Sequence, residues 1–148
     1  RRQRQMCIRD RTYRALVLSN LVAIHQKTGI GRLSAYCGAV SAGAAAGAGI
    51  AYLCGGGYEE VIHTVVNALA IVSGMVCDGA KASCAAKIAS SVDAGILGYN
   101  MYLRGQQFYA GDGIVTKGVE ATIQNIGRLG KDGMKETNEE IIKMMISD

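Results

Sequence analysis

Four cysteines in the body of the chain are the residues whose type could carry chemistry. Cys54 lies in an apolar run, where a free cysteine packs as a small hydrophobic side chain. Cys37, Cys77 and Cys84 instead lie at predicted helix ends or bends, beside small residues. Thiols placed in this way, with room next to them, are what an iron–sulfur cluster requires. None has the C-x-x-C spacing of structural zinc sites, so simple packing and cluster binding are the two interpretations.

Other patterns that suggest a site are weaker. His25 and His63 are the only histidines, which makes a zinc hydrolase centre hard to build. The glycines of residues 43–49 do not form G-x-G-x-x-G, and the Gly-Gly-Gly run at 55–57 is not followed by Lys and Ser or Thr. We therefore interpret these glycines as helix-packing and turn residues rather than as a nucleotide-binding loop.

The positive charge of the chain is confined to its first residues. The net charge of +4 comes entirely from residues 1–11 (RRQRQMCIRDR), and residues 12–148 hold eleven basic and eleven acidic residues. A nucleic-acid-binding surface on the body is therefore not expected. Residues 1–11 resemble the translated read-through of a sequencing adapter, and we predict a non-native or disordered basic tail in which Cys7 has no chemical role. A basic arm and a targeting segment are the alternatives.

Apolar periodicity predicts that residues 12–148 form a single compact, all-α domain of about six helices. The predicted helices cover residues 13–27, 33–53, 59–76, 83–103 and 117–129, and a last helix opens at Thr137. Thr137 and Glu140 fit a capping box, and Ile141, Ile142 and Met145 are expected to be buried. The Ala/Gly-rich helix over 33–53 favours tight helix packing over a membrane span, because Ala and Gly gain little in lipid.

Three stretches of the sequence carry a family resemblance that covers essentially all of residues 12–148. They are residues 18–40 (LSNLVAIHQKTGIGRLSAYCGAV), 74–89 (GMVCDGAKASCAAKIA) and 112–137 (DGIVTKGVEATIQNIGRLGKDGMKET). Together they resemble the C-terminal half of the serine dehydratase alpha-chain-like family, and its L-cysteine desulfidase branch most of all. The C-D-G-A-K-x-x-C core and the separation of forty positions between Cys37 and Cys77 are its specific features.

The resemblance implies an iron–sulfur-dependent lyase that carries out β-elimination on a small amino acid. The substrate would be L-cysteine, giving pyruvate, ammonia and sulfide, or L-serine, giving pyruvate and ammonia, with no pyridoxal phosphate. By position in the family, Cys37, Cys77 and Cys84 would bind a [4Fe–4S] cluster with one iron left open as a Lewis acid. Cys54 matches no family ligand. Arg32 and Lys81 are candidates for binding the substrate carboxylate or balancing the cluster charge, and Asp78 is a candidate for capping the helix that begins near Ser83 or for orienting Lys81.

The family's full-length chain has an additional N-terminal region with a further cysteine, which has no counterpart here once Cys7 is set aside. We therefore expect a fragment that is inactive alone and that docks on its own missing N-terminal domain or on a partner subunit; a homo-oligomer is a further arrangement. A cytoplasmic location is expected because clusters and free thiols persist in reducing compartments. The alternatives are a non-enzymatic helical interaction module with structural cysteines and, less favoured, a membrane hairpin.

Overall fold

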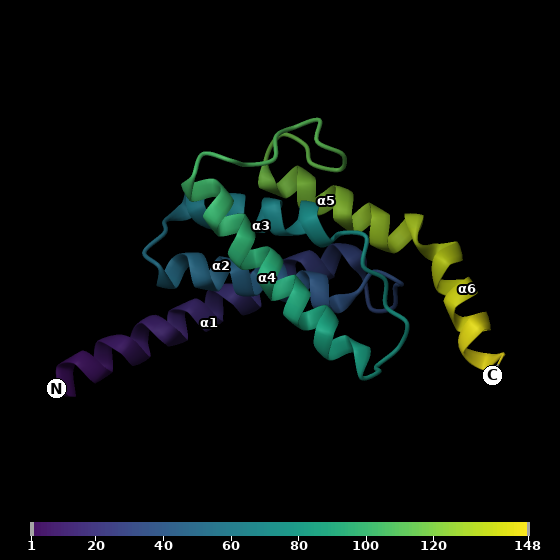
Figure 1. Cartoon of the computed structure of the whole chain (residues 1–148), viewed down its shortest axis with the longest axis horizontal. Coiled ribbons are helices and arrows are strands. Elements are labelled where there is room, and N and C mark those ends of the chain that lie inside the picture. Colours follow the sequence, from purple (N-terminus) through teal and green to yellow (C-terminus); the bar gives the residue numbers. More distant parts are fainter. Residues whose placement is uncertain (1, 148) are drawn as a thin grey trace.

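The computed structural model describes residues 2–147, and these residues form the predicted all-α fold (Figure 1). The helices are α1 (Arg2–Ile30), α2 (Gly38–Leu53), α3 (Tyr58–Val72), α4 (Ser83–Leu103), α5 (Val119–Arg128) and α6 (Lys135–Ile146), with a π-helix η1 (Leu129–Gly133) between the last two. Within this described part no strand occurs, and Tyr36 and Val76 form an isolated antiparallel bridge. None of the described helices combines the length and apolarity needed to cross a membrane.

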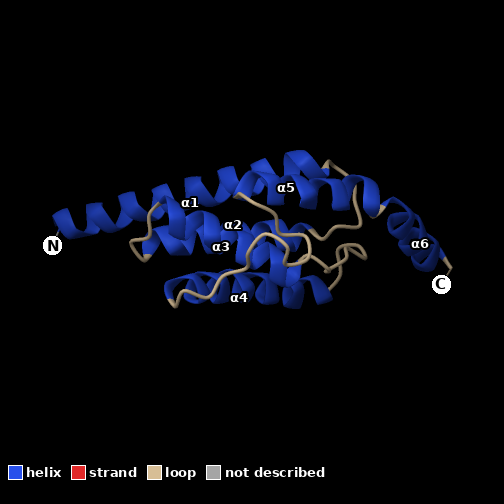
Figure 2. Ribbon diagram, turned by 90° about the horizontal axis from the view of Figure 1, so that it is seen from above, coloured by secondary structure: helices blue, strands red, loops and turns tan. Residues whose placement is uncertain are grey.

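Helix α2 lies at the centre of the bundle and packs against α1, α3 and α4 (Figures 1 and 2). Its buried face consists mostly of Ala and Gly, which confirms the predicted tight packing. A Cβ atom built on Gly47 would lie only 2.8 Å from the Cα atom of Gly95 on α4. The absence of side chains at these two positions therefore allows the two backbones to approach each other closely.

The contacts between helices also fix their directions. Gly43 of α2 faces Ser91 of α4, and Gly47 faces Gly95. The partners are 48 positions apart in both pairs, so the residue numbers rise in the same direction and α2 and α4 run parallel. Helix α3 runs antiparallel to α4. Its Asn67 side chain donates a 2.9 Å hydrogen bond to the carbonyl oxygen of Gly98, whereas Met75, just beyond the end of α3, contacts Ser91, which lies earlier on α4. The starts of α2 and α4 and the end of α3 consequently lie at one end of the bundle.

The first helix is longer than the predicted segment 13–27. Helix α1 begins at Arg2, so residues 2–11 continue the same helix, and residue 1 lies outside the described residues. The prediction that residues 1–11 are a non-native tail concerns their origin, and it stays a prediction.

Two other helix boundaries differ from the predictions by four residues or more. Helix α2 begins at Gly38 rather than at residue 33, and α3 ends at Val72 rather than at residue 76. The reason is that the segments flanking these helices pair with each other. The amide of Cys37 donates to the carbonyl of Met75 at 3.2 Å, and the amide of Cys77 donates to the carbonyl of Ala35 at 2.7 Å.

The predicted capping box of the last helix is wrong. Helix α6 begins at Lys135, directly after the π-helix, and no side chain caps it. The predicted burial is also wrong, because Ile142 and Met145 are 50% and 47% exposed and Ile141 is only half-buried. The physical reason is that α6 extends away from the core and, of the described helices, packs only against η1 (Figure 1).

Candidate functional site

The fold brings the three predicted cluster ligands to the same end of the bundle. Cys37 is the N-cap residue of α2, Cys84 lies in the first turn of α4, and Cys77 follows α3. The register of the parallel helices α2 and α4 places Cys37 level with residue 85, next to Cys84. The antiparallel bridge between Tyr36 and Val76 places Cys37 opposite Met75 and Cys77 opposite Ala35, so both cysteines lie one residue from the bridge. The three thiols therefore come from three segments that meet.

The electrostatics of this end of the bundle suit negatively charged groups. Two helices, α2 and α4, begin here, and the N-terminal end of a helix carries a partial positive charge from its free amide groups. Cys37 itself is 5% exposed, whereas Cys77 and Cys84 are half-buried. Thiolate ligands would thus be placed where the backbone favours their charge and where one of them is shielded from water.

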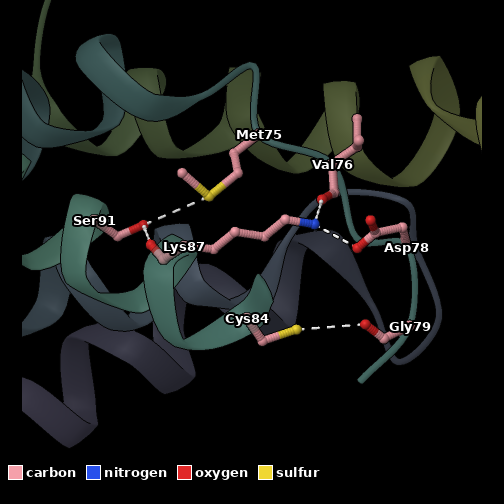
Figure 3. A network of polar contacts seen from close by, with 7 residues as sticks. All are labelled: Met75, Val76, Asp78, Gly79, Cys84, Lys87 and Ser91. Carbon is pink, nitrogen blue, oxygen red and sulfur yellow. Dashed lines mark hydrogen bonds and ion pairs between the residues drawn. The ribbon is translucent and has the colours of Figure 1, made fainter. Parts of the chain in front are cut away.

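Lys87 forms the centre of the polar network at this site (Figure 3). It lies one turn after Cys84 on α4, and its Nζ atom donates to the carbonyl oxygen of Val76 at 3.0 Å and forms an ion pair with Asp78. The hydrogen bond and charge of Lys87 lower the pKa of Asp78. Lys87 was not among the residues predicted from the sequence. Its position three residues after Cys84, on the same face of a predicted helix, is the signal that could have identified it.

A serine ties the segment that precedes Cys37 to the π-helix. The Ser34 hydroxyl donates to the carbonyl oxygen of Gly130 at 2.5 Å and accepts a 3.0 Å hydrogen bond from the amide of Tyr36. A π-helix widens the backbone ring and is found often at functional sites. Here η1 supports the extended residues that present Cys37 to the site.

The charged candidates from the sequence have different surroundings. Asp78 lies in the site, but it pairs with Lys87 and neither caps α4 nor pairs with Lys81. Lys81 is exposed on the bend between Cys77 and Cys84, and its charge adds a smaller contribution to the lowered pKa of Asp78. Arg32 is exposed in the connection between α1 and α2, beside Lys27 and Thr28. Within the described residues, the side chains of Arg32 and Lys81 form no hydrogen bond or ion pair, so both are free to meet a ligand.

Cys54 lies at the opposite end of the bundle from the other three cysteines. It is the C-cap residue of α2 and is exposed, so its expected role as a core side chain is wrong. Because α2 is sixteen residues long, the whole helix separates Cys54 from Cys37. Cys54 is therefore a matched reference for experiments on the other thiols.

The donor set fits a cluster in its chemistry, although the three thiols do not form a closed metal-binding group in the described residues. Cys84 Sγ donates to the carbonyl oxygen of Gly79 at 3.4 Å, and it must release this contact to bind a metal. Three buried side chains, those of Gln26, Tyr36 and Ser41, have polar atoms with no hydrogen-bond partner in the described residues.

Comparison with known proteins identifies the family. The model of the serine dehydratase alpha chain family matches residues 2–143, and the chain belongs to this family. A UPF0597 protein of Desulfitobacterium hafniense (strain Y51) is 69% identical over 138 residues, which are 93% of this chain and 32% of that protein. A UPF0597 protein of Lachnoclostridium phytofermentans is 57% identical over 93% of this chain and 33% of its own length. A UPF0597 protein of Treponema denticola is 53% identical over 94% of this chain and 32% of its own length.

The chain therefore spans about a third of the length of the curated relatives that it matches, at 32–33% of each. No solved structure matches it. The family match agrees with the resemblance expected from the sequence, and it relates the chain to lyase-type enzymes. The names of the relatives state no activity.

Proposed function

We propose that this chain is the cluster-binding part of an iron–sulfur lyase that carries out β-elimination on a small amino acid. The substrate would be L-cysteine, giving pyruvate, ammonia and sulfide, or L-serine, giving pyruvate and ammonia. The observation that carries the proposal is the convergence of Cys37, Cys77 and Cys84 at the end of the bundle where α2 and α4 begin.

In this proposal the three cysteines bind a [4Fe–4S] cluster, and the chain supplies the surroundings that such a group requires. When bound, the cluster would supply an iron with an open position, which polarises the leaving group of the substrate as a Lewis acid. The N-terminal ends of two helices stabilise the negative charge of the thiolates.

The proposal also assigns a role to an exposed surface of α1. An apolar stripe on α1 is exposed, comprising Tyr13, Val17, Leu21 and Ile24, which are 57–65% exposed. Their spacing of three and four positions places them on one face of the helix. Because the relatives are three times as long as the matched region, we assign this stripe to docking of the remaining part of the full-length chain. In this arrangement the other part completes the active site, and a second subunit is the competing occupant.

Anaerobic loading of the full-length protein with iron and sulfide tests the proposal. The wild type should become brown, and Cys77→Ser should lose most of the bound iron and the visible absorption. Cys54→Ser should retain both, since Cys54 lies at the other end of α2. A full-length protein that stays colourless and free of iron contradicts the proposal. So does a triple Cys→Ala variant that still binds iron, while a stable, iron-free wild type would favour the helical interaction module.

A further inference from the structure

Lys87 is a charged side chain that binds the residues on either side of Cys77, and nothing in the family resemblance assigns it a role. It projects from the second turn of α4 over the bend that carries Cys77 (Figure 3). Its side chain is only 19% exposed, although lysine normally extends into water. A half-buried lysine with fixed partners at a cluster of thiols requires a physical explanation.

The contacts of Lys87 straddle Cys77. Its Nζ atom donates to the carbonyl oxygen of Val76, immediately before Cys77, at 3.0 Å, and pairs with the carboxylate of Asp78, immediately after it. The same bend is held from the other side, where the amide of Cys77 donates to Ala35. Cys77 is thus fixed between α4 and the segment that leads into Cys37.

The charge of Lys87 acts on the other two cysteines. Its pKa is raised chiefly by the hydrogen bond to Asp78, and electrostatic attraction to Cys37 and Cys84 adds to the effect. The register between α2 and α4 agrees, since Lys87 is level with residue 39, two residues after Cys37. Cys84 lies three residues earlier on the same face of α4. One ammonium group therefore lies within electrostatic reach of thiols from two helices.

We infer that Lys87 is the positioning residue of the three-cysteine site: it fastens the Cys77 bend to α4 and places one positive charge among the thiols. The inference rests on the proposed function for the identity of the metal group. The contacts of Lys87 with the Cys77 bend and its effect on the local charge can both be measured in the metal-free chain. Three thiolates around a [4Fe–4S] core of charge +2 would leave a net charge of −1, and this charge would lie beside the ammonium group of the Lys87–Asp78 ion pair. Lys81, which lies between two of the cysteines in the sequence, is exposed and has no such contacts among the described residues.

The first test is hydrogen exchange in the metal-free protein. Lys87→Met removes the charge and both contacts while it keeps most of the side-chain volume. The amide of Cys77, which is bonded to Ala35, should then exchange about tenfold faster, as expected for the loss of charge-assisted hydrogen bonds. Lys87→Arg should restore much of the protection. The matched control is Lys135→Met, on the exposed start of α6, which should leave this amide unchanged.

The second test measures the local charge with two reagents of similar shape. Iodoacetate carries a negative charge and iodoacetamide is neutral, so the ratio of their rates at one thiol reports the local potential. Lys87→Met should lower this ratio at Cys84 about threefold, which is the effect of one charge several ångströms away in water. The ratio at Cys54 should not change, because Cys54 lies at the other end of the bundle. Lys87→Arg should keep the wild-type ratio, which a purely structural role would not predict.

The outcomes separate this inference from the proposed function. If Lys87→Met changes neither the exchange of Cys77 nor the rate ratio at Cys84, the inference is overturned, whatever the iron content. If wild-type protein and Lys135→Met bind iron while Lys87→Met binds less than half as much, both proposals are supported. If the wild type binds no iron but exchange and rate ratio respond as expected, the inference on Lys87 stands and the proposed function fails.

Discussion

The close contact between α2 and α4 makes a sharp prediction about a single methyl group. A Cβ atom added at Gly43 would lie 2.3 Å from the Cβ atom of Ser91 and 2.4 Å from its carbonyl carbon and oxygen. Carbon atoms in ordinary contact are about 3.5 Å apart or more, so the two helices would have to separate by about 1 Å. The obstructing atoms include backbone, which a side-chain rotation does not move away. Gly43→Ala must therefore displace α2 from α4.

The cost follows from the balance of two effects. Overpacking a tight core costs about 1–3 kcal/mol, and the backbone clash at Ser91 places Gly43→Ala at the upper end. Replacing a helical glycine by alanine recovers about 1 kcal/mol through helix propensity. A net loss of about 2 kcal/mol lowers the melting temperature of a domain of this size by about 4–8 °C.

Thermal unfolding followed by circular dichroism provides the assay, with Gly38→Ala as the matched control. Gly38 begins the same helix, and a Cβ atom there would meet nothing within 4 Å. Its replacement should leave the melting temperature unchanged or slightly raised. If Gly43→Ala is as stable as Gly38→Ala, the close approach of α2 and α4 is wrong, and the placement of Cys37 beside Cys84 is wrong with it.

Two further predictions concern α1. His25 Nε2 lies 2.7 Å from Glu120 Oε2, and this hydrogen bond lowers the pKa of Glu120. The pair therefore stabilises the fold above about pH 4.3, the pKa of a free glutamate, and this contribution is lost as the pH falls through the lowered pKa. Since both side chains are more than half exposed, Glu120→Gln should lower the free energy of unfolding by only about 0.5 kcal/mol at pH 5.5. In thermal melts the difference in stability between wild type and Glu120→Gln should vanish near pH 3. A difference independent of pH would contradict the assignment. Val17→Asp, on the apolar stripe of α1, should change the melting temperature of this chain by less than about 2 °C but should lower that of the full-length protein by more, because a buried, unpaired charge is costly. An equal response of the two proteins would show that the remainder of the chain does not cover this stripe.

The parts of the structure that sequence predicts well are those set by local patterns. Helix α4 begins and ends where predicted, at residues 83 and 103, because a glycine-containing turn precedes it and a glycine follows its C-cap. The boundaries of α2 and α3 depend on contacts between distant residues. Residues 33–37 have the composition of a helix, but Tyr36 pairs with Val76, and no local pattern encodes that bridge.

The same distinction applies to the site. The three cysteines stand out because of their residue type and spacing, and the fold brings their segments together. The predicted charge-balancing residues were Arg32 and Lys81, of which Lys81 is close to the cysteines in the sequence. Lys87 takes the central place instead, because the helical turn directs it back over the bend between Val76 and Asp78. Side-chain direction on a formed helix, rather than distance along the chain, decides which lysine contacts the bend.

The glycines of residues 43–49 show how packing and chemistry are connected in this domain. A glycine-rich run can form a nucleotide-binding loop, but these glycines lie within α2, where Gly43 and Gly47 face α4 and Gly49 faces α1. Because Gly43 and Gly47 have no side chains, two parallel helices come within backbone contact, and their N-terminal ends lie side by side. Larger residues would separate those ends, and with them Cys37 from Cys84. The residues with no functional groups therefore determine whether the thiols can act together.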